Sequence, residues 1–201
     1  MFKGLVLEAR SLACERGGRL IFKDLDFAIK GGEGVELRGP NGAGKSSLLR
    51  LLAGLNKPAA GTLTLTGASH EDRASEAHYI GHHEAVKPAL SVRENLEFWT
   101  RFLGGAGSAN FTAFRLEKLT EDEARYLSEG QRRRLALSRL VSVPRPIWLL
   151  DEPTVGLDQA ALADLRREME AHLAQGGMVI AATHADLGLK SIRTLEIKRA
   201  A

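Results

Sequence analysis

The sequence predicts an α/β fold built around a buried β-sheet. Two wholly apolar segments, 147–150 and 178–182, are typical of strands that are covered on both faces. Between them, residues 160–174 have the pattern of a helix that ends at Gly176-Gly177. A further strand, 35–38, alternates apolar and polar residues and leads through a glycine-rich loop into a leucine-rich helix. Strands and helices therefore follow one another along most of the chain.

Composition is consistent with one globular domain. The chain has 201 residues, 44% of them hydrophobic and 26% charged, which is enough apolar material for a core. The net charge of +3 suits an anionic ligand or a membrane surface but is too small to indicate nucleic acid. Cys14 is the only cysteine, so an internal disulfide is excluded and a reducing compartment is expected. No apolar run approaches 18 residues, so we expect no membrane span.

The glycine-rich loop fits the pattern G-x-x-x-x-G-K-[ST] of nucleotide-binding loops. Gly42 and Gly44 allow the backbone to curl so that consecutive N–H groups face a polyphosphate. Lys45 is expected to contact the β- and γ-phosphates, and the Ser46 hydroxyl to ligate Mg²⁺. The leucines that follow have helical spacing through Leu55, with Gly54 as the expected C-cap. The predicted phosphate-binding residues are Gly39, Pro40, Asn41, Gly42, Ala43, Gly44, Lys45, Ser46 and Ser47.

Strands are also predicted on both sides of this loop and its helix. Residues 5–12 and 20–29 are expected to form strands with Gly17-Gly18 and Gly31-Gly32 as turns, and 61–67 alternates strictly. A polar segment, 69–77, precedes the strand-like residues 78–81. His78 and His82 would share one face of a helix and could bind a metal there. In a strand they would be roughly 13 Å apart, and Tyr79-Ile80-Gly81 favours the strand.

Residues 92–141 are predicted to be mainly helical, with a glycine-rich connector at 104–108. Five aromatic residues cluster in this part of the sequence. They could form a small helical core or a surface patch for a partner, and we favour the core. These residues are Phe98, Trp99, Phe102, Phe111 and Phe114.

The motif Leu-Ser-Glu-Gly-Gln at 127–131 and the acidic end of the strand 147–150 carry the remaining chemistry. Ser128 and Gln131 have capping-box spacing, so a helix with an anion-attracting N-terminus should begin at Ser128. Asp151 and Glu152 follow the strand, where open α/β sheets bind ligands. Asp151 could hold Mg²⁺ and Glu152 could polarise an attacking water. Another polar residue, His184, follows the strand 178–182.

Together, the phosphate loop, the Leu-Ser-Glu-Gly-Gln signature, the strand ending in Asp-Glu and the late histidine resemble the ATP-binding cassette family. The resemblance implies a P-loop NTPase core with an N-terminal antiparallel β piece. It also implies a single domain, 1–201, with a helical subdomain inserted at approximately 88–142. Catalysis by this family implies ATP and Mg²⁺ as ligands, Glu152 as the general base and His184 as a contact to the γ-phosphate.

The same resemblance implies a head-to-tail homodimer in which ATP lies between two chains. Ser128 and Gly130 of one chain would then contact the nucleotide of the other, and Asp158 would belong to a loop that crosses the interface. Two positions depart from the family pattern. His82 stands where a glutamine is usual, and as an imidazolium it could not accept a bond from metal-bound water. Arg16 stands near the usual adenine-stacking aromatic; it could stack through its guanidinium or be a solvated turn residue.

A narrower resemblance points to the ATPase subunit of the bacterial haem exporter of cytochrome c maturation. It is carried by Cys14-Glu15-Arg16, Gly81-His82, the residues 130–137 and the segment 146–153, although His83 and 154–157 differ from that subgroup. It implies integral membrane subunits as partners and a peripheral position on the cytoplasmic face of the cell membrane.

Other functions remain as alternatives to haem export. These are the ATPase subunit of a different transporter, or a soluble cassette ATPase acting on ribosomes or DNA. The run Arg132-Arg133-Arg134 could indicate nucleic acid, but a solvated or subunit-facing stripe on the signature helix is commoner, so we expect no nucleic-acid partner. A small-molecule kinase would share the phosphate loop but not the signature, and the full set of catalytic residues disfavours a purely regulatory module.

Overall fold

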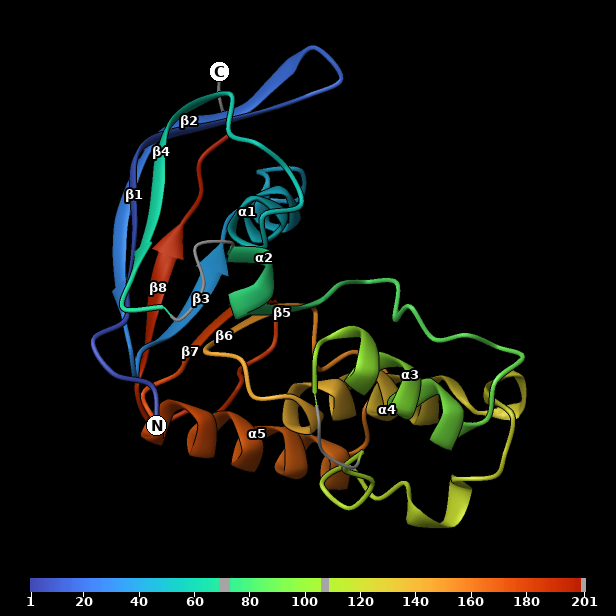
Figure 1. The fold of residues 1–201 in the computed structure, drawn as a ribbon. Helices are drawn as coiled ribbons and strands as arrows, with labels where there is room; N and C mark the ends of the chain where they lie inside the picture. The colour runs from blue at the N-terminus through green and yellow to red at the C-terminus, as the bar shows by residue number, and fades with distance from the viewer. Residues whose placement is uncertain (69–72, 106–108, 200–201) are drawn as a thin grey trace.

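The computed structural model describes residues 1–68, 73–105 and 109–199. Its centre is a five-stranded sheet in the order β5-β6-β7-β3-β8, in which every neighbouring pair is parallel (Figure 1). The five strands are β3 (Gly34–Arg38), β5 (Ala77–Ile80), β6 (Ile147–Asp151), β7 (Met178–Ala182) and β8 (Ile192–Glu196). The predicted α/β fold is confirmed, and so is the strand assignment of His78.

A second sheet is formed near the N-terminus by three antiparallel strands in the order β2-β1-β4. Its strands are β1 (Val6–Arg16), β2 (Arg19–Lys30) and β4 (Ala60–Thr66). In the central strand, Leu7 lies opposite both Ile29 and Leu65, so one face of this sheet is apolar. Figure 1 shows the sheet standing beside the parallel one, with α1 close to both. This is the antiparallel β piece that the family resemblance implied.

Helix α1 (Lys45–Leu52) packs on one face of the parallel sheet, and α4 (Glu129–Ser142) and α5 (Gln159–Ala174) pack on the other. Alternate residues of β6 explain both contacts. Ile147 and Leu149 belong to the core cluster that holds the α1 leucines, whereas Trp148 and Leu150 belong to the cluster that holds α4 and α5. Burial on both faces therefore accounts for the apolar residues at the first four positions of β6, which ends in Asp151.

The loop helix is shorter than its leucine pattern predicted. It ends at Leu52, and Gly54 adopts a positive φ of 72° just beyond the Ala53 cap. Leu55 is 58% exposed, so its expected place in the helix is wrong. The physical reason is that a left-handed residue after the cap turns the chain away from the helix axis.

Among the described residues between β5 and β6, the helical elements are α3 (Val92–Phe102), α4 and the two 3₁₀ turns Glu117–Leu119 and Ala124–Tyr126. A short helix, α2 (Arg73–Glu76), precedes β5; the earlier part of the polar segment, 69–72, lies outside the described residues, as do 106–108 of the connector. A separate small core lies among these helices, formed by Val92, Leu96, Leu116, Ala124, Leu127 and Leu135. We propose approximately 88–142 as the helical subdomain.

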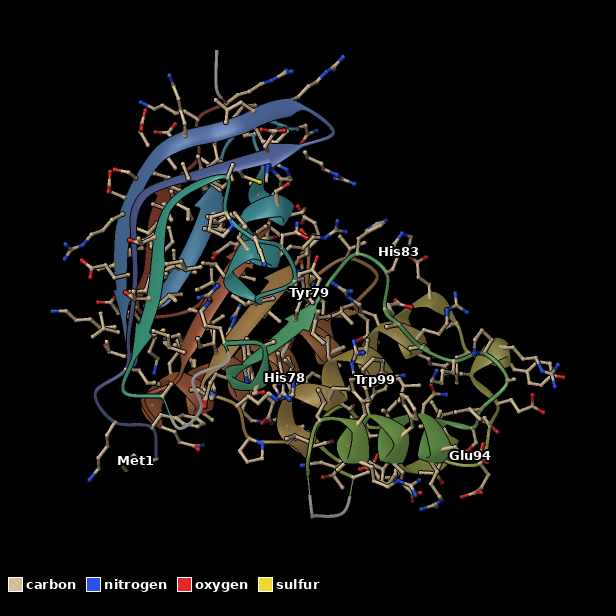
Figure 2. The ribbon with its side chains drawn as sticks, turned by 45° about the horizontal axis from the view of Figure 1, so that its top comes forward. Met1, His78, Tyr79, His83, Glu94 and Trp99 are labelled. Atoms are coloured by element: carbon tan, nitrogen blue, oxygen red, sulfur yellow. The ribbon has the colours of Figure 1, made fainter. Side chains whose placement is uncertain are left out.

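The aromatic residues of this region do not form one core. Phe114 is fully buried, but Phe102 is 69% exposed, which contradicts the expectation of a shared core. Phe98 and Trp99 are partly buried and contact the Phe102 ring. The Trp99 ring, labelled in Figure 2, also lies against the guanidinium of Arg139 on α4. Of the described helices, none is both long and apolar enough to cross a membrane.

Candidate functional site

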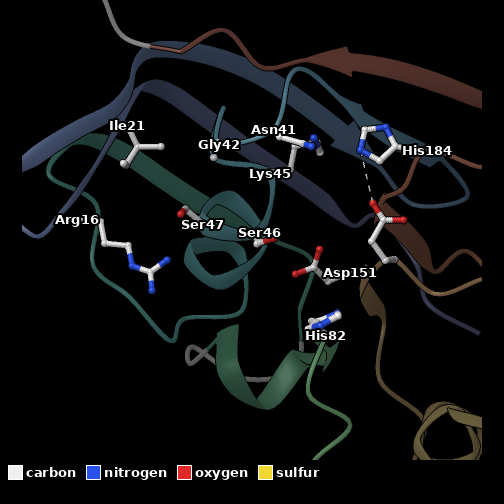
Figure 3. Close-up of a pocket in the computed structure, with 12 residues that line it drawn as sticks. Arg16, Ile21, Asn41, Gly42, Lys45, Ser46, Ser47, His82, Asp151 and His184 are labelled. Atoms are coloured by element: carbon white, nitrogen blue, oxygen red, sulfur yellow. Dashed lines mark ion pairs between the residues drawn. The ribbon is translucent and has the colours of Figure 1, made fainter. Parts of the chain in front are cut away.

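A pocket of about 410 Å³ lies beyond the carboxyl ends of β3, β6 and β7. This is where open parallel sheets bind ligands, because loops leave neighbouring strands at that edge. Figure 3 shows Arg16 and Ile21 at one end of the pocket and His184 at the other. The lining residues are Arg16, Ile21, Asn41, Gly42, Gly44, Lys45, Ser46, Ser47, His82, Asp151, Glu152 and His184.

The phosphate loop joins β3 to α1 and depends on its glycines. Gly42 and Gly44 have φ angles of 81° and 103°, which L-residues with side chains rarely adopt. A Cβ on Gly44 would also lie 2.6 Å from Cγ2 of Ile21, so both the conformation and the space require glycine. Gly44 is the N-cap of α1, and it has no side chain to accept bonds from the first-turn N–H groups. Those donors, together with the helix dipole, make the loop an anion site.

Lys45 is held inside the loop rather than extended into solvent. Its Nζ donates to the carbonyl of Gly39 at 2.8 Å and lies 3.4 Å from the carbonyl of Pro40. The ammonium group is therefore positioned beside the N-terminus of α1, where it adds a full positive charge to the partial charge of the helix. Gly39, Pro40 and Ala43 belong to the loop but do not line the pocket.

Two carboxylates at the end of β6 face the loop. Asp151 is 7% exposed and completes the strand, whereas Glu152 follows it with a φ of 47°. The N–H of Glu152 donates to the carbonyl of Ala182 on β7 at 2.8 Å, which fixes this unusual conformation. Its Oε1 lies 3.9 Å from Nε2 of His184 (Figure 3). The ends of β6 and β7 thus bring an acid and a histidine together at one side of the pocket.

Magnesium fits the donors that the pocket offers. The Ser46 hydroxyl and the Asp151 carboxylate both line it, and oxygen ligands are those that Mg²⁺ prefers. No group of three or more His, Cys, Asp or Glu side chains that could hold a metal occurs among the described residues. That is compatible with Mg²⁺ in a nucleotide site, because this ion keeps several waters and takes phosphate oxygens as ligands.

Three predicted site residues outside the phosphate loop do not line the pocket either. Ser128 caps α4. Its Oγ accepts a hydrogen bond from the N–H of Gln131 at 3.2 Å, and the side chain of Gln131 accepts one from the N–H of Ser128 at 2.7 Å. Gly130 packs against Gly156, whose carbonyl would lie 2.7 Å from a Cβ at that position. Asp158 caps α5 by accepting from the N–H of Ala161 at 2.8 Å.

Two residues near the pocket escaped prediction. Ile21 lines it as an apolar wall beside Arg16, and its only sequence signal was its place in an apolar strand. Arg133 was expected in a solvated or subunit-facing stripe, but it is 4% exposed and donates to the carbonyls of Asp151 and Glu152. The expectation of a solvated Arg133 is therefore wrong. Nothing in the sequence signalled this, because the carbonyls that bind it lie in distant strands.

Known proteins resemble this chain in both sequence and fold. Residues 22–155, more than half of the chain, match the family described as ABC transporter. The "Cytochrome c biogenesis ATP-binding export protein CcmA" of Rhodopseudomonas palustris (strain HaA2) is 52% identical over 199 residues, covering 97% of this chain and 99% of its own length.

Two solved structures share the fold at low sequence identity. The first is described as the structure of an ATP-binding subunit of an ABC transporter; it has a TM-score of 0.82 at 24% identity and covers 98% of this chain and 90% of its own. The second is a dimeric post-hydrolysis state of an ATP-binding cassette with ADP and Pi, with a TM-score of 0.80 at 23% identity and coverages of 96% and 94%. The chain belongs to the ABC transporter family of ATP-binding proteins, within the group formed by the CcmA relatives.

Proposed function

We propose that this chain is the ATP-hydrolysing subunit of a membrane complex that exports haem for cytochrome c biogenesis. The observation that carries the ATPase part is the pocket, which gathers Lys45, Ser46, Asp151, Glu152 and His184 around one phosphate-binding loop. The export part is supported by the printed name of the 52% identical relative, which is an ATP-binding export protein of cytochrome c biogenesis.

In the proposed reaction, the phosphate loop and Lys45 hold the β- and γ-phosphates. Ser46 and Asp151 would hold Mg²⁺, which would neutralise charge on the phosphates. The first-turn N–H groups of α1 and the Nζ of Lys45 stabilise charge that develops on the γ-phosphate, in a geometry that the loop already has. Little reorganisation is then needed at the moment of reaction.

Glu152 is the proposed general base. It takes a proton from, or orients, the water that attacks the γ-phosphate. His184, whose Nε2 lies 3.9 Å from Oε1 of Glu152, is proposed to contact the same phosphate. The carboxylate is accessible to water because its side chain is 28% exposed. His82 lines the same pocket, and we propose that its imidazole would accept a hydrogen bond from the water of a bound Mg²⁺.

Adenine is proposed to bind at the other end of the pocket, between Arg16 and Ile21 (Figure 3). An arginine plane can stack on a base, and an apolar Ile21 can cover its edge. Both residues come from β1 and β2, so the antiparallel sheet would supply base binding while the parallel sheet supplies phosphate binding.

A homodimer held by ATP is proposed because Ser128, Gly130 and Asp158 lie outside the pocket of their own chain. Ser128 and Gly130 lie at the N-terminus of α4. This N-terminus can bind the γ-phosphate of the ATP held by a second chain, in the same way as α1 binds the phosphates of the ATP in its own chain. Integral membrane subunits are the proposed partners, and the proposed location is the cytoplasmic face of the cell membrane.

The test of the ATPase assignment is Glu152→Gln, with Glu121→Gln as the matched control. Glu121 is 77% exposed, pairs with Arg93 and is not part of the pocket. Removing a general base is expected to lower turnover about 10²–10⁴-fold while leaving ATP binding nearly unchanged. Glu121→Gln should keep wild-type turnover. Hydrolysis by Glu152→Gln at close to the wild-type rate would show that the general base is another group.

The export assignment has its own experiment, which is purification of the complex from detergent-solubilised membranes. Identification of haem-handling membrane subunits with the chain would support it. Recovery with membrane subunits of an unrelated transporter would overturn haem export but leave the ATPase assignment intact.

A further inference from the structure

Arg133 is a buried cation beside the catalytic pocket. It lies on α4, is 4% exposed and forms no direct ion pair within the described residues. A charge removed from water is costly unless hydrogen bonds replace its hydration. Burial accordingly lowers the pKa of the Arg133 guanidinium, and the negative charges of Glu84, Asp151 and Glu152 act in the opposite direction.

Backbone carbonyls at two strand ends provide those hydrogen bonds. Nη1 donates to the carbonyl of Gly81 at 3.1 Å, just after β5 and just before His82. Nη2 donates to the carbonyls of Asp151 at 3.0 Å and Glu152 at 2.7 Å, at the end of β6. Nε has no hydrogen-bond partner among the described residues, so the two terminal nitrogens make all of these contacts. One planar group therefore joins α4 to the two strand ends that carry pocket residues.

Glu152 is the residue most sensitive to this contact. Its positive φ is uncommon for a residue with a side chain, and such conformations persist only where surrounding contacts fix them. Its N–H is fixed by Ala182 on β7, and its carbonyl by Arg133 on α4. The direction of the Glu152 side chain toward His184 therefore depends on two hydrogen bonds to the Glu152 backbone, one at its N–H and one at its carbonyl.

We propose that Arg133 is a positioning residue for ATP hydrolysis, which sets the backbone of Glu152 and of the segment before His82 from the signature helix of the same chain. The inference rests on the proposed role of Glu152 as general base. It assigns a mechanical path: a displacement of α4 moves the guanidinium, and the Glu152 carbonyl follows it. A second contact supports the path, since Gly130 of α4 packs closely against Gly156 of the loop that follows Glu152.

Arg133→Gln and Arg133→Lys test the proposal, with Arg134→Gln as the matched control. Arg134 is the next residue of α4 and also donates to two carbonyls, those of Phe114 and Arg115, neither of which belongs to the pocket. Glutamine at 133 cannot bridge both strand ends, and misplacement of a catalytic group by about 1 Å costs on the order of 100-fold in rate. We expect kcat to fall roughly 10- to 100-fold, with the KM for ATP within about threefold of wild type.

The lysine variant keeps the charge but not the planar fork, so it should give an intermediate kcat. If Arg133→Gln does not fold, Arg133→Lys can still be measured and tests the same proposal. Arg134→Gln should lower the melting temperature without this loss of kcat. A kcat for both Arg133 variants that matches Arg134→Gln would overturn the proposal.

A double-mutant cycle with Glu152→Gln separates positioning from a general structural effect. Single-turnover rates with labelled ATP are measured for both single variants and the double variant. If Arg133 acts through Glu152, adding Arg133→Gln to Glu152→Gln should lower the residual rate less than threefold. Additive losses would refute positioning even though Glu152→Gln is inactive. Wild-type turnover of Glu152→Gln itself would instead refute the proposed general-base role of Glu152, on which this inference rests.

Discussion

Acid should destabilise this protein through two buried histidines, His78 on β5 and His172 on α5. They are 3% and 6% exposed, and burial is the largest cause that lowers their pKa values to about 3 and about 4. Nε2 of His78 donates to the carbonyl of Val143 at 2.7 Å, and Nε2 of His172 donates to that of Pro146 at 3.1 Å. A second proton would therefore have to bind the other ring nitrogen inside the core.

The sign of the effect follows from the depressed pKa values. In the unfolded chain both rings titrate near 6.5, so below that pH the unfolded state binds protons that the folded state does not. The contribution of the two neutral histidines to the free energy of unfolding is fully present above about pH 7 and is lost as the pH decreases toward 4. Between pH 7 and pH 5 each histidine should lower the free energy of unfolding by about 1.9 kcal/mol, or about 4 kcal/mol for the pair.

The assay is urea unfolding at pH 7, 6 and 5 for wild type, His78→Gln and His83→Gln. Glutamine at 78 can donate to the Val143 carbonyl without titrating, so about half of the histidine-linked loss should disappear. His83 is exposed, so His83→Gln should keep the wild-type pH dependence. An unchanged pH dependence in His78→Gln, or no loss of wild-type stability between pH 7 and pH 5, would refute the reasoning.

Two further predictions concern the nucleotide. Arg16→Ala should raise the KM for ATP about fivefold to thirtyfold, which corresponds to the loss of a stacking contact worth about 1–2 kcal/mol. Arg16→Tyr should restore the wild-type KM. Equal KM values for the wild type and both variants would show that Arg16 is a solvated turn residue. Mixing Lys45→Ala with Ser128→Arg, each inactive alone, should recover partial activity because one composite site stays intact. Activity that is strictly first order in protein, with no recovery on mixing, would exclude the head-to-tail homodimer.

Local motifs allowed the phosphate loop and its flanks to be predicted from sequence. The loop, the capping box of Ser128 and the acidic end of β6 each depend on residues that are close in the chain, so their spacing is visible in the sequence. The structure brings Lys45, Asp151 and His184 to one pocket because three neighbouring parallel strands end there. That convergence follows from the strand order, which local motifs do not reveal.

Features that depend on distant contacts could not be predicted. Strand β8 is an edge strand with two half-buried and three exposed residues, so it lacks the apolar pattern of β6 and β7. The exposure of Phe102 depends on which face of α3 meets α4, and periodicity alone does not distinguish the two faces. Arg133 was expected near solvent because charged residues usually are, and its carbonyl partners lie 18 to 52 residues away.

The place of β3 in the sheet constrains how the protein is made on the ribosome. Strand β3 carries the phosphate loop and is synthesised early, yet its neighbours are β7 and β8, which are among the last segments to be translated. ATP therefore cannot bind to and stabilise the nascent chain while most of it emerges. The exposed edges of β3 have to be protected from wrong pairing until residues 178–196 arrive. Nascent chains arrested before β7 should consequently fail to retain ATP, although they already contain the whole phosphate loop.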